Sequence, residues 1–204
     1  MSSILLLTSS PRSESLSTSI AVELADKLKS QNQGSVVVRR DLAANPLPHI
    51  DDLFTAAIRK PPEARTAEEA AAVKTSDELV NELLAADSIV IGTGLINFNI
   101  YSSLKTWIDN VARAGLTFKY TESGPVGLAT GKKVYVVLAS GGVYSQGPAA
   151  GMNHAVPYLK SVLGFLGITD IETIYVEGLA FGPEAAEKAI GAAKSRVEEL
   201  ALAA

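Results

Sequence analysis

Hydroxyl side chains are concentrated in one short segment near the N-terminus. Between Thr8 and Ser19, eight of twelve residues are serine or threonine and none is glycine. The segment follows an apolar run at 4–7 and precedes a helical pattern at 17–31, so it would bring together hydroxyls, backbone N–H groups and the positive end of a helix dipole. This combination suits a phosphate group, to which Arg12 could add charge. Serine and threonine are also favoured as helix caps, so an ordinary polar loop is the alternative.

Two further loops carry amide or very small side chains directly after apolar runs. Residues 92–99 include Asn97-Phe98-Asn99, whose amides could bind the edge of a planar ring beside an apolar wall, although a simple turn with an inward-facing Phe98 fits equally well. Residues 139–142 include Ser140-Gly141-Gly142, where missing side chains would let backbone N–H groups approach a ligand. Paired glycines also mark ordinary turns, so a plain turn is the alternative here too.

The side chains that usually carry catalysis are scarce. The chain has no cysteine, only two histidines (His49 and His154), and neither an H-E-x-x-H nor a G-x-S-x-G motif. Gly92 and Gly94 form a G-x-G, but the third glycine of the dinucleotide-binding fingerprint is missing and the pair follows the third apolar run rather than the first. Neither histidine is expected to be catalytic, and no metal site is expected. A bound organic cofactor is the expected carrier of difficult chemistry.

The charge balance limits the classes of partner. With 18 Lys+Arg against 22 Asp+Glu, the formal net charge is −4, and neither sign forms a long block. Nucleic acid and anionic membranes reward a basic face, so neither is expected as the main partner. Because the sequence has no long apolar run and no secretory pattern, we expect a cytoplasmic protein.

The three loops are positioned by an alternation of apolar runs and helical patterns. This alternation is typical of a doubly wound α/β fold, a parallel sheet with helices on both faces, which binds ligands beyond the carboxyl ends of its strands. The predicted strands are 4–7, 36–38, 89–91, 134–138 and 171–176, and the predicted helices are 17–31, 66–86, 103–114, 153–166 and one from 183 onward.

The connecting segments carry signals of their own. Residues 41–60 are proline-containing and predict an extended connection with one short helix. Thr66 and Glu69 have the spacing of a capping box, and Gly115 is placed to terminate the preceding helix. Residues 117–132 contain three glycines and a proline and predict a loop. Without an internal repeat, residues 1–204 are expected to form a single domain.

Motifs along essentially the whole chain resemble the FMN-dependent NADH azoreductase family of quinone and azo-dye reductases. The matching segments are Arg40-Asp41-Leu42-Ala43-Ala44-Asn45-Pro46, Asn97-Phe98-Asn99-Ile100, Val111-Ala112-Arg113-Ala114-Gly115, Thr117-Phe118-Lys119-Tyr120-Thr121, Gly131-Lys132-Lys133, Pro157-Tyr158-Leu159, Leu163-Gly164-Phe165-Leu166-Gly167-Ile168, Glu177-Gly178 and Gly182-Pro183-Glu184. The resemblance implies a flavodoxin-like sheet with strand order 2-1-3-4-5, bound FMN, NADH or NADPH as electron donor, and a homodimer with sites at the interface.

The resemblance also implies roles for individual residues. The phosphate of FMN would be held by Ser10 and by Ser15-Leu16-Ser17. Leu95-Ile96-Asn97-Phe98 would line the isoalloxazine edge, Ala139-Ser140-Gly141-Gly142 would contact its pyrimidine end, and Tyr144 would lie near its face. The residues implied in substrate and nicotinamide handling, partly across the dimer interface, are Arg59, Phe118, Tyr120 and Phe165.

The sequence departs from the family pattern at three places. The family commonly has Pro-Met-Tyr where Gly94-Leu95-Ile96 stands, glutamine where Leu16 stands, and arginine where Ser140 stands. These changes remove an aromatic edge and a cation, which affects the expected substrate range and flavin affinity more than the reaction class.

The implied reaction is a ping-pong transfer of two electrons from NAD(P)H through FMN to quinones and azo compounds. A flavodoxin-type electron carrier is one alternative. An NAD(P)H:FMN reductase that supplies free reduced flavin is another, because Ser9-Ser10-Pro11-Arg12 resembles the opening of such enzymes.

Overall fold

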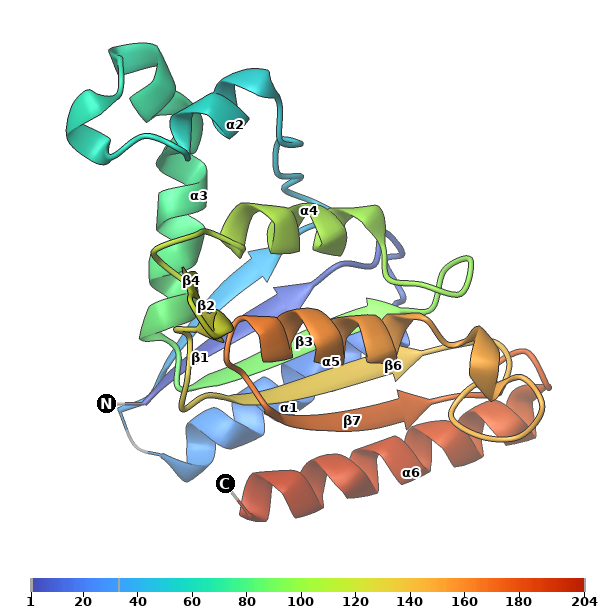
Figure 1. Cartoon of the computed structure of the whole chain (residues 1–204). Coiled ribbons are helices and arrows are strands. Elements are labelled where there is room, and N and C mark those ends of the chain that lie inside the picture. Colours follow the sequence, from blue (N-terminus) through green and yellow to red (C-terminus); the bar gives the residue numbers. More distant parts are fainter. Residues whose placement is uncertain (1, 33, 204) are drawn as a thin grey trace.

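Five parallel strands form the centre of the molecule, shown as a computed structural model in Figure 1, which describes residues 2–32 and 34–203. The strands are β1 (Ser3–Thr8), β2 (Val36–Asp41), β3 (Ser88–Gly94), β6 (Lys133–Ala139) and β7 (Asp170–Val176). Their order across the sheet is β2-β1-β3-β6-β7, which is 2-1-3-4-5 when these five are numbered among themselves. The predicted flavodoxin-like sheet is therefore confirmed.

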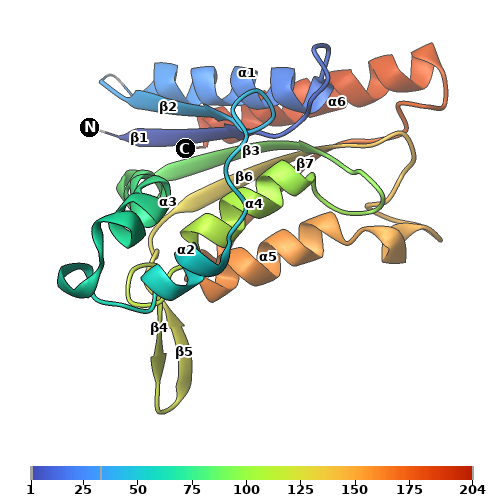
Figure 2. The ribbon, with the colours of Figure 1, turned by 90° about the horizontal axis from the view of Figure 1, so that it is seen from above.

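Helices cover both faces of this sheet (Figures 1 and 2). On one face lie α1 (Leu16–Gln31) and α6 (Pro183–Leu202), and on the other lie α3 (Ala67–Ala85), α4 (Ser102–Val111) and α5 (Ala155–Phe165). Successive strand residues point to opposite faces, so Leu6 packs under α1 while Leu5 and Leu7 pack on the other side. The apolar runs in the sequence are continuous because both faces of the central strands are buried.

The segment between β2 and α3 contains the expected short helix, α2 (Asp52–Ala57), followed by the single turn η1 (Pro62–Ala64). The capping box at Thr66 and Glu69 is also confirmed: the Thr66 hydroxyl accepts from Glu69 N–H at 3.2 Å, and the Glu69 carboxylate accepts from Thr66 N–H at 2.9 Å. This cap fixes the start of α3, which packs against α2.

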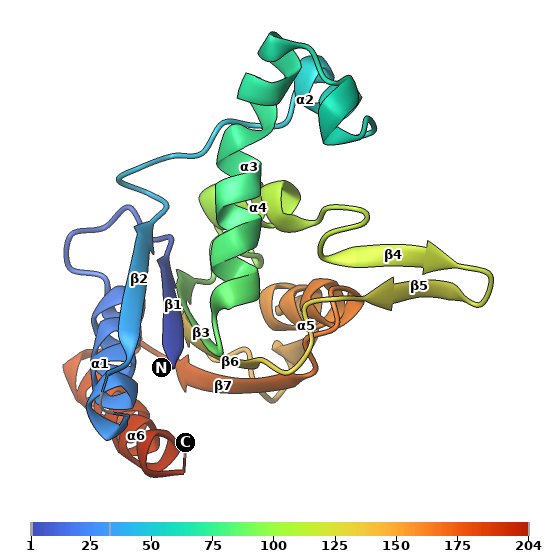
Figure 3. The ribbon, with the colours of Figure 1, turned by 90° about the vertical axis from the view of Figure 1, so that its left-hand side faces the viewer.

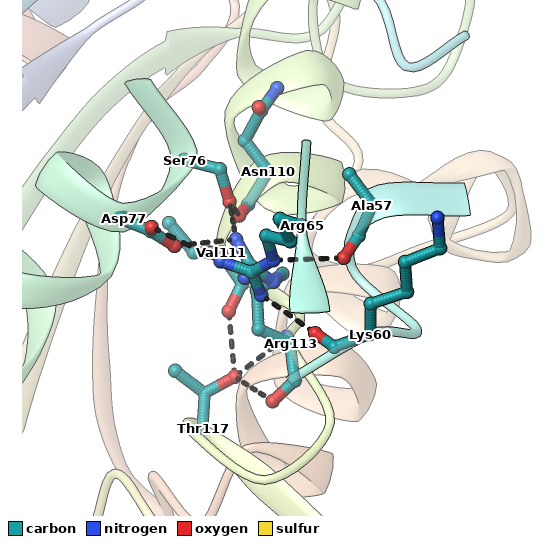
Figure 4. Close-up of polar contacts among 9 residues, drawn as sticks. All are labelled: Ala57, Lys60, Arg65, Ser76, Asp77, Asn110, Val111, Arg113 and Thr117. Carbon is teal, nitrogen blue, oxygen red and sulfur yellow. Dashed lines mark hydrogen bonds and ion pairs between the residues drawn. The ribbon is translucent and has the colours of Figure 1, made fainter. Parts of the chain in front are cut away.

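A buried arginine cluster holds the α2 segment against α3 and α4 (Figure 4). Arg113 is only 3% exposed, donates to the Ser76 hydroxyl at 2.5 Å and pairs with Asp77 at 3.0 Å. Desolvation lowers the pKa of Arg113. Arg65 donates to the carbonyls of Ala57 at 3.0 Å and Lys60 at 3.1 Å. Arg65 and Arg113 thus connect the α2 segment, α3 and the end of α4.

The prediction of a loop at 117–132 is wrong. The structure has an antiparallel hairpin there, β4 (Phe118–Thr121) and β5 (Gly124–Gly127), which projects beside α5 in Figure 3. Pro125 is tolerated because the ribbon has only two strands, which leaves free edges where a missing N–H breaks no ladder bond. The overlooked signal is the alternation of Phe118 and Tyr120, whose rings lie 5.5 Å apart on one side of the ribbon.

The predicted end of the helix at Gly115 is also wrong. Helix α4 ends at Val111 with Ala112 as its C-cap. The chain then turns because the Thr117 hydroxyl accepts from Arg113 N–H at 2.9 Å and donates to the Val111 carbonyl at 2.6 Å. Gly115, with φ +81°, lies in this later turn rather than at the helix end.

In residues 2–32 and 34–203, no helix combines the length and the apolar character needed to cross a membrane.

Candidate functional site

The loops that follow β1, β3 and β6 enclose a cavity of about 510 Å³ at the carboxyl edge of the sheet. This volume lies in the usual range for small-molecule sites. Predicted site residues that line the cavity are Ser10, Ser15, Leu16, Ser17, Leu95, Ile96, Ala139, Ser140 and Gly141. The lining also includes Arg12, Glu14, Gly94, Tyr101, Leu179, Ala180 and Ala186. The sheet therefore brings together three loops that are far apart in the sequence.

The first loop presents donors at the start of α1. Ser15 is the N-cap, its hydroxyl accepts from Thr18 N–H at 3.2 Å, and it lies 3.0 Å from the Ser17 hydroxyl. Backbone N–H groups in the first turn of a helix have no acceptor within the helix. Those of Leu16 and Ser17 therefore point out of the N-terminal end of α1, where the helix dipole favours an anion. Arg12 brings a cation to the same rim and Glu14 a carboxylate.

Gly92 allows the start of α1 to approach the sheet closely. A Cβ at this position would lie 2.8 Å from the Ser17 carbonyl oxygen and 2.9 Å from the Ala21 Cβ. The Ser9 hydroxyl fixes the same region from the other side, donating to the Thr93 hydroxyl at 2.9 Å. The G-x-G pair is thus no dinucleotide fingerprint, but its first glycine sets the distance between α1 and β3.

The second loop contains a tight turn in an uncommon conformation. Ile96 and Asn99 pair across it with two backbone hydrogen bonds of 2.9 Å, and the central residues Asn97 and Phe98 have φ of +46° and +67°. The left-handed region costs a non-glycine residue about 1–2 kcal/mol. His154 supports the turn by donating its backbone N–H to the Phe98 carbonyl at 2.9 Å.

The Phe98 side chain is directed outward, 40% exposed, so the alternative of an inward-facing ring is wrong. It meets Tyr144 edge to face, with ring centroids 6.1 Å apart. Tyr144 is held in turn by Glu177, whose carboxylate accepts from Tyr144 N–H at 2.8 Å. Asn97, Phe98, Gly142 and Tyr144 are not part of the cavity lining.

The third loop packs closely on the segment after β7. A Cβ at Gly141 would lie 3.3 Å from the Ala180 Cβ, and Ala180 N–H donates to the Gly141 carbonyl at 2.9 Å. The Ser140 hydroxyl donates to the Gly142 carbonyl at 2.8 Å, which stabilises the turn. Ser140 is 5% exposed and lines the cavity.

The four residues assigned to substrate handling do not reach this cavity within one chain. Phe118 packs against Phe165 with tilted rings whose centroids lie 4.5 Å apart, next to Tyr120 on the hairpin. Arg59 follows α2. Figure 1 shows the hairpin toward the amino ends of the strands, whereas the residues that line the cavity follow their carboxyl ends. Their role stays a prediction that requires a second copy of the chain.

Tyr101, Leu179, Ala180 and Ala186 line the cavity without having been predicted. Tyr101 had a usable signal, an aromatic residue directly before a helix and next to Asn97-Phe98-Asn99-Ile100. Across the described ranges, no group of three or more His, Cys, Asp or Glu side chains could hold a metal ion.

A doubly wound sheet of this strand order, with a hydroxyl-lined helix start and a cavity at the carboxyl edge, defines a flavodoxin-like protein with a site for an anionic, ring-bearing ligand. A family model described as "Flavodoxin-like fold" matches residues 2–201. The FMN-dependent NADH:quinone oxidoreductase of Rhizobium johnstonii is 92% identical over 204 residues, which is all of both chains. That of Agrobacterium fabrum is 71% identical over 205 residues, again covering all of both chains.

Two solved structures agree with this relationship. The azoreductase of Bacillus anthracis str. Sterne is 36% identical, with a TM-score of 0.90 over 98% of this chain and 99% of that one. An FMN-dependent NADH-azoreductase from Bacillus anthracis str. Ames Ancestor, solved in complex with FMN, is 29% identical, with a TM-score of 0.87 over 98% of this chain and 100% of that one. The chain belongs to this flavodoxin-like family of FMN-dependent quinone and azo-dye oxidoreductases, and the resemblance drawn from its motifs is confirmed.

Proposed function

We propose that this protein is an FMN-dependent oxidoreductase that passes two electrons from NADH or NADPH to quinones and aromatic azo compounds. The observation that carries the proposal is the 510 Å³ cavity, which joins a helix start lined by serines to an apolar wall and a loop of exposed backbone. These are the three surfaces that a phosphate, a ring edge and a polar ring end require. The names of the relatives support the same reaction.

The residues present fit FMN. Ser10, Ser15 and Ser17, with the backbone N–H groups at the start of α1, would hold the phosphate. Leu95 and Ile96 supply the apolar wall, whereas Gly141 offers its backbone N–H at the polar end of the ring. Bound FMN would supply the hydride acceptor and the two-electron reservoir. The protein's share is to hold the ring, stabilise charge near it and exclude water.

We also propose a ping-pong order and a homodimer. Phe98 and Tyr144 form the aromatic surface beside the cavity, and a single surface of this kind would serve donor and acceptor in turn. Tyr120 is 73% exposed on the projecting hairpin, and Leu116 and Val126 are about 40% exposed beside it. A second copy could cover this apolar surface and bring Phe118, Tyr120 and Phe165 to the partner's site, with Arg59 at the same interface.

Steady-state kinetics of the FMN-loaded protein test the proposal. NADH oxidation should depend on added benzoquinone or on an azo dye, and double-reciprocal plots at several quinone concentrations should be parallel. Intersecting lines would contradict the ping-pong order. FMN binding without NADH oxidation would instead indicate an electron carrier, whereas loss of FMN during gel filtration with continued turnover would indicate a reductase of free flavin.

A further inference from the structure

Tyr101 lies where three cavities meet. It lines the cavity of about 510 Å³, a second of about 270 Å³ beside His49 and Thr106, and a third of about 490 Å³ beside Lys105 and Tyr158. No other residue in the described part of the chain lines all three. Tyr101 therefore lies between the candidate FMN cavity and both of its neighbours.

The position of the Tyr101 ring is set by Gly94. A Cβ at Gly94 would lie 3.2 Å from the Tyr101 Cε2 atom and 3.3 Å from its hydroxyl oxygen. The edge of the ring thus lies directly against Gly94, and a side chain at position 94 would push the ring aside by a few tenths of an ångström. Tyr101 is also the N-cap residue of α4, and its carbonyl accepts from the N–H groups of Leu104 and Lys105 at 3.1 Å each, so its backbone is fixed.

The rest of the wall near this ring is aliphatic. Ile96 lines the same cavity at the position where the family motif has tyrosine, and Leu95 lies next to it. Tyr101 is the one aromatic side chain in the cavity lining of the described residues. A planar ligand in the cavity therefore finds its aromatic contact at Tyr101, the N-cap of α4, rather than at position 96.

We propose that Tyr101 provides the aromatic contact for the isoalloxazine ring of FMN in this protein, and that its side chain limits the size of the acceptor by closing off the two neighbouring cavities. Gly94 and Tyr101 act as a pair, because the glycine leaves the space that the ring fills. This inference rests on the proposed function, since it assumes that FMN occupies the 510 Å³ cavity.

The first test measures FMN affinity by equilibrium dialysis of the folded apoprotein, together with the visible band positions of bound FMN. An aromatic contact is worth about a two- to tenfold change in affinity, so Tyr101→Ala should weaken FMN binding by about that factor and shift the bands. Tyr101→Phe keeps the ring and should stay within about twofold of the wild type. Tyr158→Ala is the matched control: of the three cavities, Tyr158 lines the one of 490 Å³ and not the candidate FMN cavity, so this change should leave FMN affinity unchanged.

The second test measures coupling between the two positions. Gly94→Ala alone should weaken FMN binding, because its Cβ displaces the ring. In the Tyr101→Ala background the same change should have almost no further effect, so the two effects should not add. Additive effects would overturn the pairing of Gly94 with Tyr101.

The third test compares acceptors of different size. Tyr101→Ala should raise the ratio of kcat/KM for a naphthoquinone to kcat/KM for benzoquinone, because removal of the ring joins the cavities. Unchanged FMN affinity and an unchanged acceptor ratio in Tyr101→Ala, with a wild type that binds FMN, would overturn this inference alone. A wild type that binds no FMN would overturn the proposed function instead.

Discussion

Replacing Gly92 by alanine should displace the start of α1 and damage the phosphate side of the site. The new Cβ would lie 2.8 Å from the Ser17 carbonyl oxygen and 2.9 Å from the Ala21 Cβ, both closer than real Cβ contacts. The first neighbour is helix backbone, and Gly92 sits on β3 at the centre of the sheet, so neither side can yield through a simple rotamer change. Overpacking of this kind costs about 1–3 kcal/mol.

Urea denaturation followed by tryptophan fluorescence measures this loss of stability. Trp107 is the only tryptophan and is fully buried, so its emission reports unfolding. With a urea dependence of about 2 kcal/mol/M, the expected loss lowers the unfolding midpoint by about 0.5–1.5 M. FMN affinity should fall as well, because Ser15 and Ser17 move with the helix. Gly191→Ala is the control: it lies in α6 with nothing within 4 Å of its added Cβ, and should raise stability by about 0.5–1 kcal/mol without changing FMN affinity. A Gly92→Ala protein as stable as the wild type, with the same FMN affinity, would refute the reasoning.

Three further predictions concern stability. Arg113→Met should lower the unfolding free energy by about 2–3 kcal/mol, which is less than for a fully buried pair because Asp77 stays partly exposed. Arg196→Met, which removes an exposed ion pair, should lower it by less than about 1 kcal/mol. Chemical denaturation of both variants measures the two losses. Tyr135→Phe should raise stability by up to about 1 kcal/mol in the same assay, because the buried Tyr135 hydroxyl has no hydrogen-bond partner among the described residues. Hydrogen bonds from Lys60 and from Thr66 N–H lower the pKa of Glu69, so Glu69 stabilises the fold above its unfolded pKa of about 4.3. The stability difference between wild type and Glu69→Gln should therefore be full at pH 7 and shrink as the pH falls through the folded pKa; a difference that does not change with pH would contradict this.

The sheet was predictable because burial on both faces leaves a strong local signal. Continuous apolar runs such as 4–7 and 134–138 can be read without knowledge of their neighbours. The hairpin at 118–127 could not be predicted in this way, because its stability depends on the packing of Phe118 against Phe165, a residue far along the chain. The end of α4 at Val111 depends similarly on Thr117, whose hydroxyl replaces a helical partner.

The site was predictable at the level of loops rather than side-chain directions. The serine-rich segment and residues 139–142 follow strands, and parallel strands place such loops at one edge. The outward direction of Phe98 depends on two left-handed residues held by the backbone of His154, which no local pattern announces. Tyr101 reaches the cavity because Gly94 leaves room for its ring. The two residues lie at opposite ends of the loop between β3 and α4, and only the folded chain brings them into contact.

Anaerobic stopped-flow spectroscopy of the FMN-loaded protein tests the central claim most directly. Mixing with NADH should remove the visible absorbance of the oxidised flavin, and a second mixing with benzoquinone should restore it completely, at rates compatible with steady-state turnover. Flavin absorbance that persists in the presence of NADH would contradict the account.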